Sequence, residues 1–126
     1  MHIAYISGPY TAPTPEAVEA NILKAAAVAA EVAALGYAVF CPHTNSYWVD
    51  GAKPGLSYEY WLAADLAILT KCDLIVMVPG WEWSNGAGRE NAAAELRNMA
   101  IYYHPGTMPP ALVGVEVETG GRAWTI

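Results

Sequence analysis

Short apolar segments that stop at glycine or proline alternate with longer stretches of helical periodicity along the chain. We expect strands at Ile3 to Ile6, Tyr37 to Cys41, Asp73 to Val78 and Ala111 to Val117, and helices over about 15–35, 57–71 and 89–103. This alternation is typical of a parallel sheet with helices on both faces, because parallel strands need crossover connections. We therefore predict a three-layer α/β fold with four or five parallel strands, ordered 2-1-3-4-5 if there are five.

Composition narrows the class of protein. The 126 residues suffice for a single domain with a core, and a net charge of -6 leaves no basic stripe for binding nucleic-acid phosphates. Apolar runs are shorter than the roughly 20 residues of a membrane span, and the N-terminus lacks the basic start of a signal peptide. Cys41, Cys72 and the histidines show no metal-ligand spacing. We expect a cytoplasmic protein that acts without nucleic acid, membrane or metal.

Three loops follow expected strands and should therefore share one edge of the sheet. They are Ser7-Gly8-Pro9-Tyr10, a long segment from Pro42 to Ser57, and Pro79 to Gly88. We expect residues His43 to Leu56 to form an irregular loop of the kind that is often functional. Because ligands of parallel α/β sheets bind outside the carboxyl ends of the strands, a binding site is predicted at this edge.

The segment Ser84-Asn85-Gly86-Ala87-Gly88-Arg89-Glu90 carries the clearest chemical signal. Gly86 and Gly88 would let backbone N–H groups converge before a helix whose positive end attracts an anion. Glu90 would then lie in the first helical turn, where the same field favours its ionised form, and such a carboxylate can act as a nucleophile at a glycosyl centre. The alternative is a plain tight turn with Glu90 as an ordinary residue of the helix start.

Asp65 is the second candidate. It shares an otherwise apolar helix face with Tyr58, Trp61 and Ile68, so its carboxyl group lies either at the rim of a pocket or beside a buried partner. A rim aspartate paired with Lys71 is the alternative.

Aromatic residues gather near the same loops. Trp81 and Trp83 flank the glycine-rich segment, Tyr47 and Trp48 lie in the long segment, and Tyr5 and Tyr10 bracket the first loop. Their rings suit a planar base, and they would equally suit a subunit interface.

Taken together, these motifs are similar to those of the nucleoside 2-deoxyribosyltransferase-like superfamily, and most of all its small bacterial and phage members. The matching elements are Tyr5-Ile6-Ser7-Gly8-Pro9-Tyr10, the pair Asp65 and Asp73, and Ser84-x-Gly86-Ala87-Gly88-x-Glu90. The resemblance covers roughly residues 1 to 103 and implies a flavodoxin-like, Rossmann-like fold.

The resemblance also implies roles for these residues. Glu90 would attack the anomeric carbon to form a glycosyl-enzyme intermediate, and Asp65 would help to bind the substrate and release the base. Serine at position 84 is typical of members that hydrolyse nucleoside 5′-monophosphates, whereas members that act on free nucleosides carry an acidic residue there. The first loop lacks an arginine that some nucleotide hydrolases place in it, for which Arg89 or Lys53 could substitute. The substrate-binding set would comprise Tyr5, Ser7, Gly8, Pro9, Tyr10, Ser84, Gly86 and Gly88.

We therefore predict cleavage of the base–sugar bond of a (deoxy)nucleoside 5′-monophosphate, or transfer of the (deoxy)ribosyl group between bases, with no metal or organic cofactor. The alternatives are a non-catalytic module that binds or senses a nucleotide and a structural subunit whose tryptophans form an interface. A homodimer or larger homo-oligomer is expected, because five Trp and eight Tyr exceed what so small a core can bury. The resemblance likewise implies that neighbouring subunits complete each pocket.

Overall fold

Four parallel strands form one sheet in the order β2-β1-β3-β4 in the computed structural model, which describes residues 1–53, 55–103 and 105–111. The strands are β1 (Ile3–Ser7), β2 (Ala38–Phe40), β3 (Leu74–Met77) and β4 (Ala100–Tyr102). In the middle of the sheet, β1 pairs with β2 on one side and β3 on the other. The predicted α/β, flavodoxin-like three-layer fold with a parallel sheet of four or five strands is thus confirmed.

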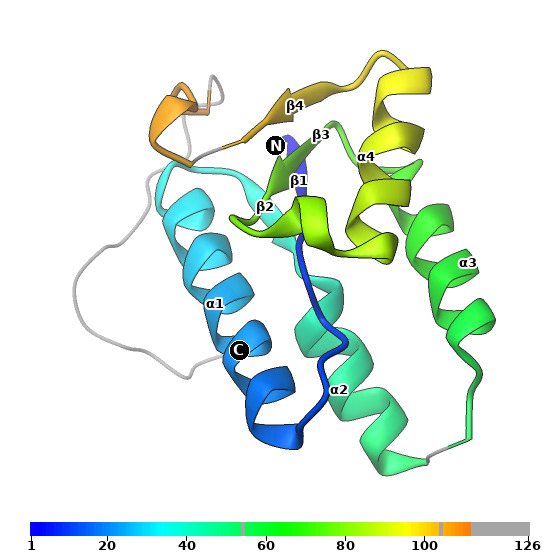
Figure 1. The fold of residues 1–126 in the computed structure, drawn as a ribbon. Coiled ribbons are helices and arrows are strands. Elements are labelled where there is room, and N and C mark those ends of the chain that lie inside the picture. Colours follow the sequence, from blue (N-terminus) through cyan, green and yellow to red (C-terminus); the bar gives the residue numbers. More distant parts are fainter. Residues whose placement is uncertain (54, 104, 112–126) are drawn as a thin grey trace.

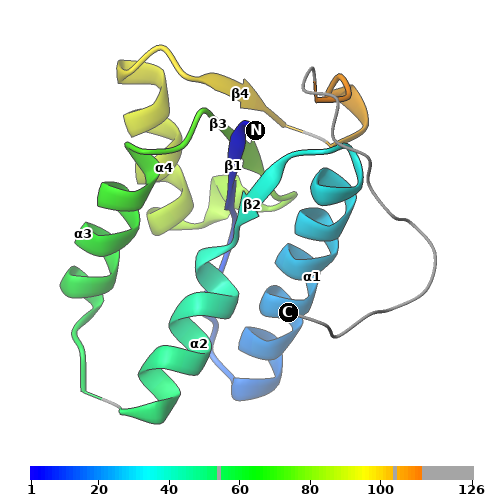
Figure 2. The ribbon, with the colours of Figure 1, turned by 180° about the vertical axis from the view of Figure 1, so that it is seen from behind.

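One face of the sheet is covered by α1 (Pro15–Ala34), which Figures 1 and 2 show on the side opposite α3 and α4. As its sequence predicts, the helix begins at a Thr14 cap, whose hydroxyl accepts the N–H of Ala17, and stops before Gly36 at φ 99°. Small and β-branched residues of α1 let it lie close to the strands. The buried residues of this layer include Ala25, Val28, Ala29 and Val32 from α1 with Ala4, Ile6 and Val76 from the sheet.

The other face carries α3 (Tyr58–Leu69) and α4 (Asn85–Leu96). Alternate strand residues point to opposite faces, so Tyr5 and Ile75 pack on this side while Ala4 and Ile6 pack on the other. Leu69 of α3 and Ala87 and Ala94 of α4 complete this second core. None of the helices within the described ranges is long and apolar enough to cross a bilayer.

The segment after β2 is a helix, α2 (Pro42–Ala52), and the expectation of an irregular loop from His43 to Leu56 was wrong. Pro42 occupies the first helical turn, where its missing N–H costs nothing and its fixed φ favours the helix. The helix lies beyond the carboxyl ends of the strands, next to the lower part of α1 (Figure 1).

The bounds of α4 also differ from those expected. The Ser84 hydroxyl accepts the N–H of Ala87, so the helix begins at Asn85 and not at residue 89. It ends at Leu96, well before residue 103, because Asn98 adopts a left-handed conformation with φ 54° and directs the chain into β4. The fourth strand of the sheet is therefore 100–102; of the strand expected at 111–117, all but the first residue lies outside the described residues.

Two short 3₁₀ segments complete the described elements. They are η1 (Trp81–Trp83), directly before α4, and η2 (Pro105–Thr107), after β4.

Candidate functional site

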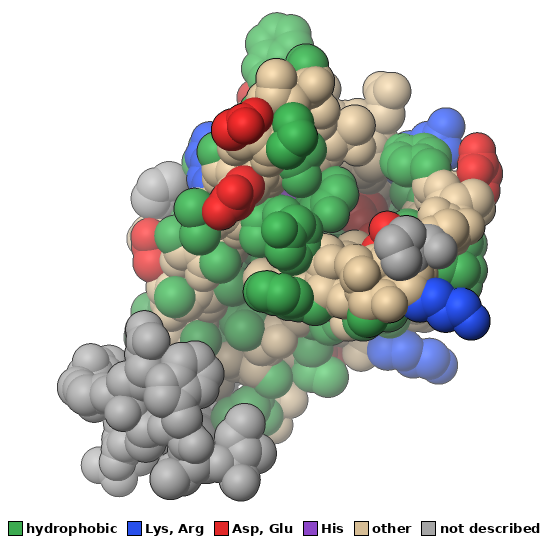
Figure 3. Space-filling view, turned by 90° about the horizontal axis from the view of Figure 1, so that it is seen from below, with side chains coloured by type: hydrophobic (Ala, Val, Ile, Leu, Met, Phe, Trp, Pro, Cys, Tyr) green, Lys and Arg blue, Asp and Glu red, His purple; other side chains and the backbone are tan. Residues whose placement is uncertain are grey.

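A cavity of about 680 Å³ opens at the carboxyl ends of the strands. Its walls come from the loop after β1, α2, α3, the 3₁₀ turn 81–83 and the start of α4. Figure 3 views this end of the molecule, where hydrophobic side chains surround a hollow. The lining includes Gly8, Pro9, Tyr10, His43, Asp50, Trp61, Asp65, Trp83, Ser84, Gly86 and Glu90. The predicted edge of the sheet therefore does hold a cavity of ligand size.

Glu90 is buried beside this cavity and is held by two hydroxyl groups from the central strand. Tyr5 and Ser7 are alternate residues of β1, so both side chains point to the face that α4 covers. The Tyr5 hydroxyl donates to Oε2 of Glu90, and Ser7 Oγ donates to Oε1 over 2.6 Å. Tyr5 and Ser7 are fully buried, and neither lines the cavity itself. Their described link to the cavity is the hydrogen bond that each makes to Glu90.

The electrostatics of Glu90 differ from those that the sequence suggested. Because α4 begins at Asn85, Glu90 lies in the second turn, and the field of the helix end is weaker there. Burial raises the pKa of Glu90 above its ordinary value, and the hydrogen bonds from Ser7 and Tyr5 offset only part of that rise. Burial and the nearby Glu90 charge raise the pKa of Tyr5, which therefore stays a hydroxyl donor. The ionised form of Glu90 thus depends on two hydroxyl groups.

Asp65 places a second carboxyl group in the same cavity, from α3. Its Oδ1 atom is buried and has no hydrogen-bond partner in the part of the chain that the structure describes. It therefore makes no hydrogen bond to Lys71. Burial, reinforced by the charge of Glu90, raises the pKa of Asp65 to about 7. At neutral pH this group can therefore both donate and accept a proton, whereas Glu90 is the carboxylate that hydroxyl donors stabilise.

The loop after β1 is fixed from three sides. A side chain at Gly8 would bring its Cβ to 2.6 Å from the Cβ of Val78, so only glycine fits this approach to the end of β3. The carbonyl of Pro9 accepts the Nε2–H of His43 over 2.8 Å, and the carbonyl of Tyr10 accepts a hydrogen bond from the Asn21 amide over 3.1 Å. The loop therefore presents Pro9 and Tyr10 to the cavity in a defined position.

Two glycines that were expected to form a phosphate-type loop are helical residues. Gly86 lines the cavity, where an added Cβ would lie 3.7 Å from the Tyr58 hydroxyl. Gly88 does not line it, and an added Cβ there would meet no atom within 4 Å. The Ser84 hydroxyl is engaged in the helix cap. The start of α4 therefore faces the cavity as an ordinary capped helix end.

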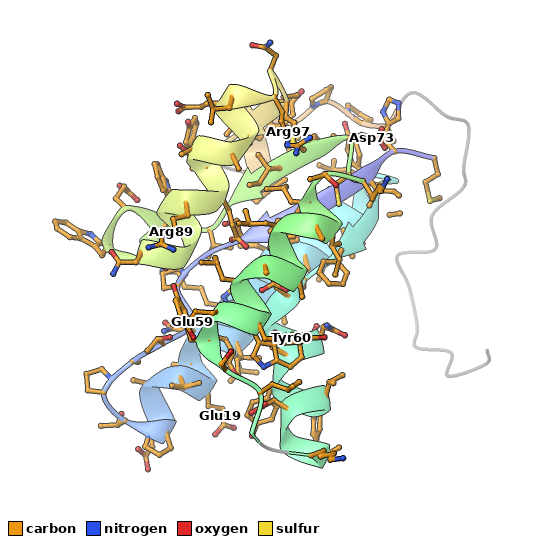
Figure 4. The ribbon with its side chains drawn as sticks, turned by 90° about the vertical axis from the view of Figure 1, so that its right-hand side faces the viewer. Glu19, Glu59, Tyr60, Asp73, Arg89 and Arg97 are labelled. Carbon is orange, nitrogen blue, oxygen red and sulfur yellow. The ribbon has the colours of Figure 1, made fainter. Side chains whose placement is uncertain are left out.

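Other residues named from the sequence lie outside the cavity. Asp73 accepts the N–H of Ile3 over 2.7 Å and belongs to the opposite end of the sheet, as Figure 4 shows. Arg89, labelled on α4 in Figure 4, and Lys53 are not among the described lining residues.

Of the aromatic residues named from the sequence, some line the cavity and others lie outside it. Tyr10 and Trp83 line the cavity, whereas Trp81 packs on Tyr103 with ring centroids 5.7 Å apart. Tyr47 and Trp48 contact each other on α2 outside the lining.

Sequence reasoning missed the contribution of α2. His43, Ser46 and Asp50 line the cavity at helical spacing, which became visible only once the segment was known to be a helix. The proline at its first position was the available signal. Burial lowers the pKa of His43, so its ring is neutral, with Nε2–H on Pro9 and Nδ1 4.0 Å from Cys41 Sγ.

Comparison with known proteins places this arrangement in one family. No curated protein matches the chain. A family described as a domain of unknown function, DUF4406, matches residues 2–103. The match spans all four strands, α1 to α4 and both carboxyl groups of the cavity. The chain is therefore a member of the DUF4406 family.

Proposed function

We propose that the protein cleaves or exchanges the N-glycosidic bond of a (deoxy)nucleoside or its 5′-monophosphate, with Glu90 as the nucleophile and Asp65 as the proton donor. One observation carries the proposal: Glu90, held by Tyr5 and Ser7, lines the same cavity as a second carboxyl group whose Oδ1 has no partner among the described residues. Paired carboxyl groups with different environments are what a glycosyl-transferring site requires.

The chemistry follows from those environments. An oxygen of Glu90 attacks the anomeric carbon, the carbon–nitrogen bond breaks, and the base leaves with the proton of Asp65. Water then attacks the same carbon and gives a proton to the Asp65 carboxylate, which releases the sugar and restores Glu90. A nitrogen of a second base can replace water in this step, which yields exchange.

The hydroxyl groups of Tyr5 and Ser7 contribute by orientation. Each oxygen of Glu90 accepts one hydrogen bond within the protein, which fixes the plane of the carboxylate toward the cavity. Aromatic rings in the lining, such as Tyr10 and Trp61, offer faces on which a base can pack. The resemblance to the nucleoside 2-deoxyribosyltransferase-like superfamily supports the same assignment of roles.

The experiment that tests the proposal is incubation with nucleosides and their 5′-monophosphates, with and without a free base, followed by chromatographic separation of the products. Base release indicates a hydrolase and base exchange a transferase. Glu90→Gln removes the attacking charge at nearly constant volume, so turnover should fall by several orders of magnitude while binding persists.

Glu95→Gln is the matched control, because Glu95 is an exposed residue of the same helix. Wild-type turnover in Glu90→Gln, with an unchanged circular dichroism spectrum, would refute the nucleophile. Binding without turnover in the unsubstituted protein would instead indicate a sensing module.

A further inference from the structure

The lining of the cavity is acidic. Asp50 from α2, Asp65 from α3 and Glu90 from α4 all reach it, so three helices each contribute one acidic side chain. No lysine or arginine occurs among the described residues of this lining. The whole chain carries a net charge of -6, which makes the electrostatic potential in the cavity more negative.

Asp50 is held in place by an aromatic neighbour. The indole Nε1–H of Trp61 donates to its Oδ1 over 3.4 Å, a long bond that links the end of α2 to α3. Burial and the charge of Asp50 raise the pKa of Tyr10, so the field of this carboxylate reaches the loop after β1. Asp50 therefore contributes to the potential inside the cavity and still has acceptor capacity on its second oxygen.

The start of α4 opposes this field only in part. A helix end corresponds to about half a positive charge, against the carboxylates of Asp50 and Glu90 and a partly protonated Asp65 in the same lining. The N–H of Ala87 is also engaged by the Ser84 hydroxyl, and the N–H of Gly88 by the Ser84 carbonyl. A phosphate dianion in this cavity would therefore meet net repulsion, whereas hydroxyl and amino groups would find acceptors.

We infer that the cavity selects an uncharged nucleoside over its 5′-monophosphate, with Asp50 as the specificity residue that accepts hydrogen bonds from the ligand. The inference rests on the proposed function, because it names the substrate class of the same site. It favours the free nucleoside, whereas the serine at position 84 indicated the 5′-monophosphate.

Binding measurements test this without requiring turnover. In the Glu90→Gln background, tryptophan fluorescence titrations give the Kd of each common 2′-deoxynucleoside and of its 5′-monophosphate. At least one nucleoside should bind about tenfold more tightly than its monophosphate, because like charges in a partly dry cavity are poorly screened. High salt should reduce the ratio of the monophosphate Kd to the nucleoside Kd.

Adding Asp50→Asn should also narrow the ratio, since it removes one repulsive charge and one strong acceptor. Glu59→Gln is the matched control: Glu59 is exposed on α3, outside the lining, and the change removes the same charge from the chain (Figure 4). In the Glu59→Gln control, the ratio of the monophosphate Kd to the nucleoside Kd should equal that of the Glu90→Gln background.

Three results would overturn the inference. The first is that each monophosphate binds as tightly as its nucleoside, and the second is that no nucleoside binds at millimolar concentration. The third is that Asp50→Asn and Glu59→Gln change the ratio of the two Kd values equally. Failure of the proposed function is a separate result, the absence of base release or exchange by the unsubstituted protein. Nucleoside-selective binding without turnover would leave the present inference standing and refute the proposed chemistry.

Discussion

Ser7 Oγ lies 2.6 Å from Oε1 of Glu90, although 83 positions separate the two residues in the chain. The contact joins the central strand to α4 and is fully shielded from solvent on the Ser7 side. Since a hydrogen bond to a carboxylate favours its ionised form, Ser7, like Tyr5, stabilises the ionised form of Glu90.

Ser7→Ala should therefore raise the pKa of Glu90. A buried bond to a charged acceptor contributes about 1.5–3 kcal/mol, which corresponds to a rise of about one unit or more. A carbon-13 NMR titration of the glutamate carboxyl groups measures it directly. Ser46→Ala removes another buried hydroxyl of the cavity as a control; equal midpoints in the two variants would contradict the role of Ser7.

Asp65 should make the protein less stable as the pH rises. Its pKa is 3.8 ordinarily and about 7 in the folded chain, so between these values the folded state holds more protons than the unfolded state. The free energy of unfolding then falls with increasing pH across this window and levels off above about 7.

Asp65→Asn removes that dependence. The variant should exceed the parent in unfolding free energy at pH 8 by about 1–2 kcal/mol, after allowance for solvent screening of a half-buried group, and show no such gain at pH 4. Urea unfolding at both pH values measures the difference. A gain of the same size at pH 4 and pH 8 would show that ionisation of Asp65 is not its cause.

Two glycines should respond to alanine in opposite directions. Gly8→Ala places a methyl group 2.6 Å from the Cβ of Val78, next to the backbone of the central strands, and should cost about 1–3 kcal/mol of stability. Gly88→Ala adds a methyl group to a helix where no atom lies within 4 Å, and should stabilise by about 0.5–1 kcal/mol. Thermal unfolding of each single variant measures its change in stability. A destabilised Gly88→Ala would contradict a helical, open environment for that residue.

The protein should associate with itself. The Trp48 side chain is 73% exposed and that of Trp83 is 91% exposed, which is unusual for residues of this size in a monomer. Light scattering at micromolar concentration should give the mass of a dimer or a larger homo-oligomer. Trp48→Ser or Trp83→Ser should weaken the association, and a monomeric mass for the parent chain would refute it.

The parts of the fold that could be read from the sequence are those with unambiguous ends. Thr14 and Gly36 fix the ends of α1, and the apolar run of β3 is bounded by a turn on each side. These signals act within a few residues, so they do not depend on tertiary contacts.

The rest depended on less visible signals. Asn45, Ser46 and Gly51 are weak helix formers, so α2 resembles a loop until the packing of its inner face is known. Arg97, Met99 and Ala100 after Leu96 are also good helix formers, so Asn98 is the signal that marks the end of α4. Glu90 and Asp65 could be chosen as candidates from their motifs, but the pairing of Glu90 with Tyr5 and Ser7 required the alternation of β1 and the position of α4 together.

The central position of β1 links the acidity of Glu90 to the integrity of the sheet. Tyr5 pairs through its backbone with β2 and β3, Ser7 pairs with β3, and the same two buried side chains hold the carboxylate. A change at either position should therefore alter the stability of the sheet and the pKa of Glu90 together. The α2 wall, with Asp50, lies outside the sheet, so its side chains can change without altering strand pairing. Under the proposed function, new ligand preferences in this architecture should therefore arise through α2, while the contact of Glu90 with Tyr5 and Ser7 is kept.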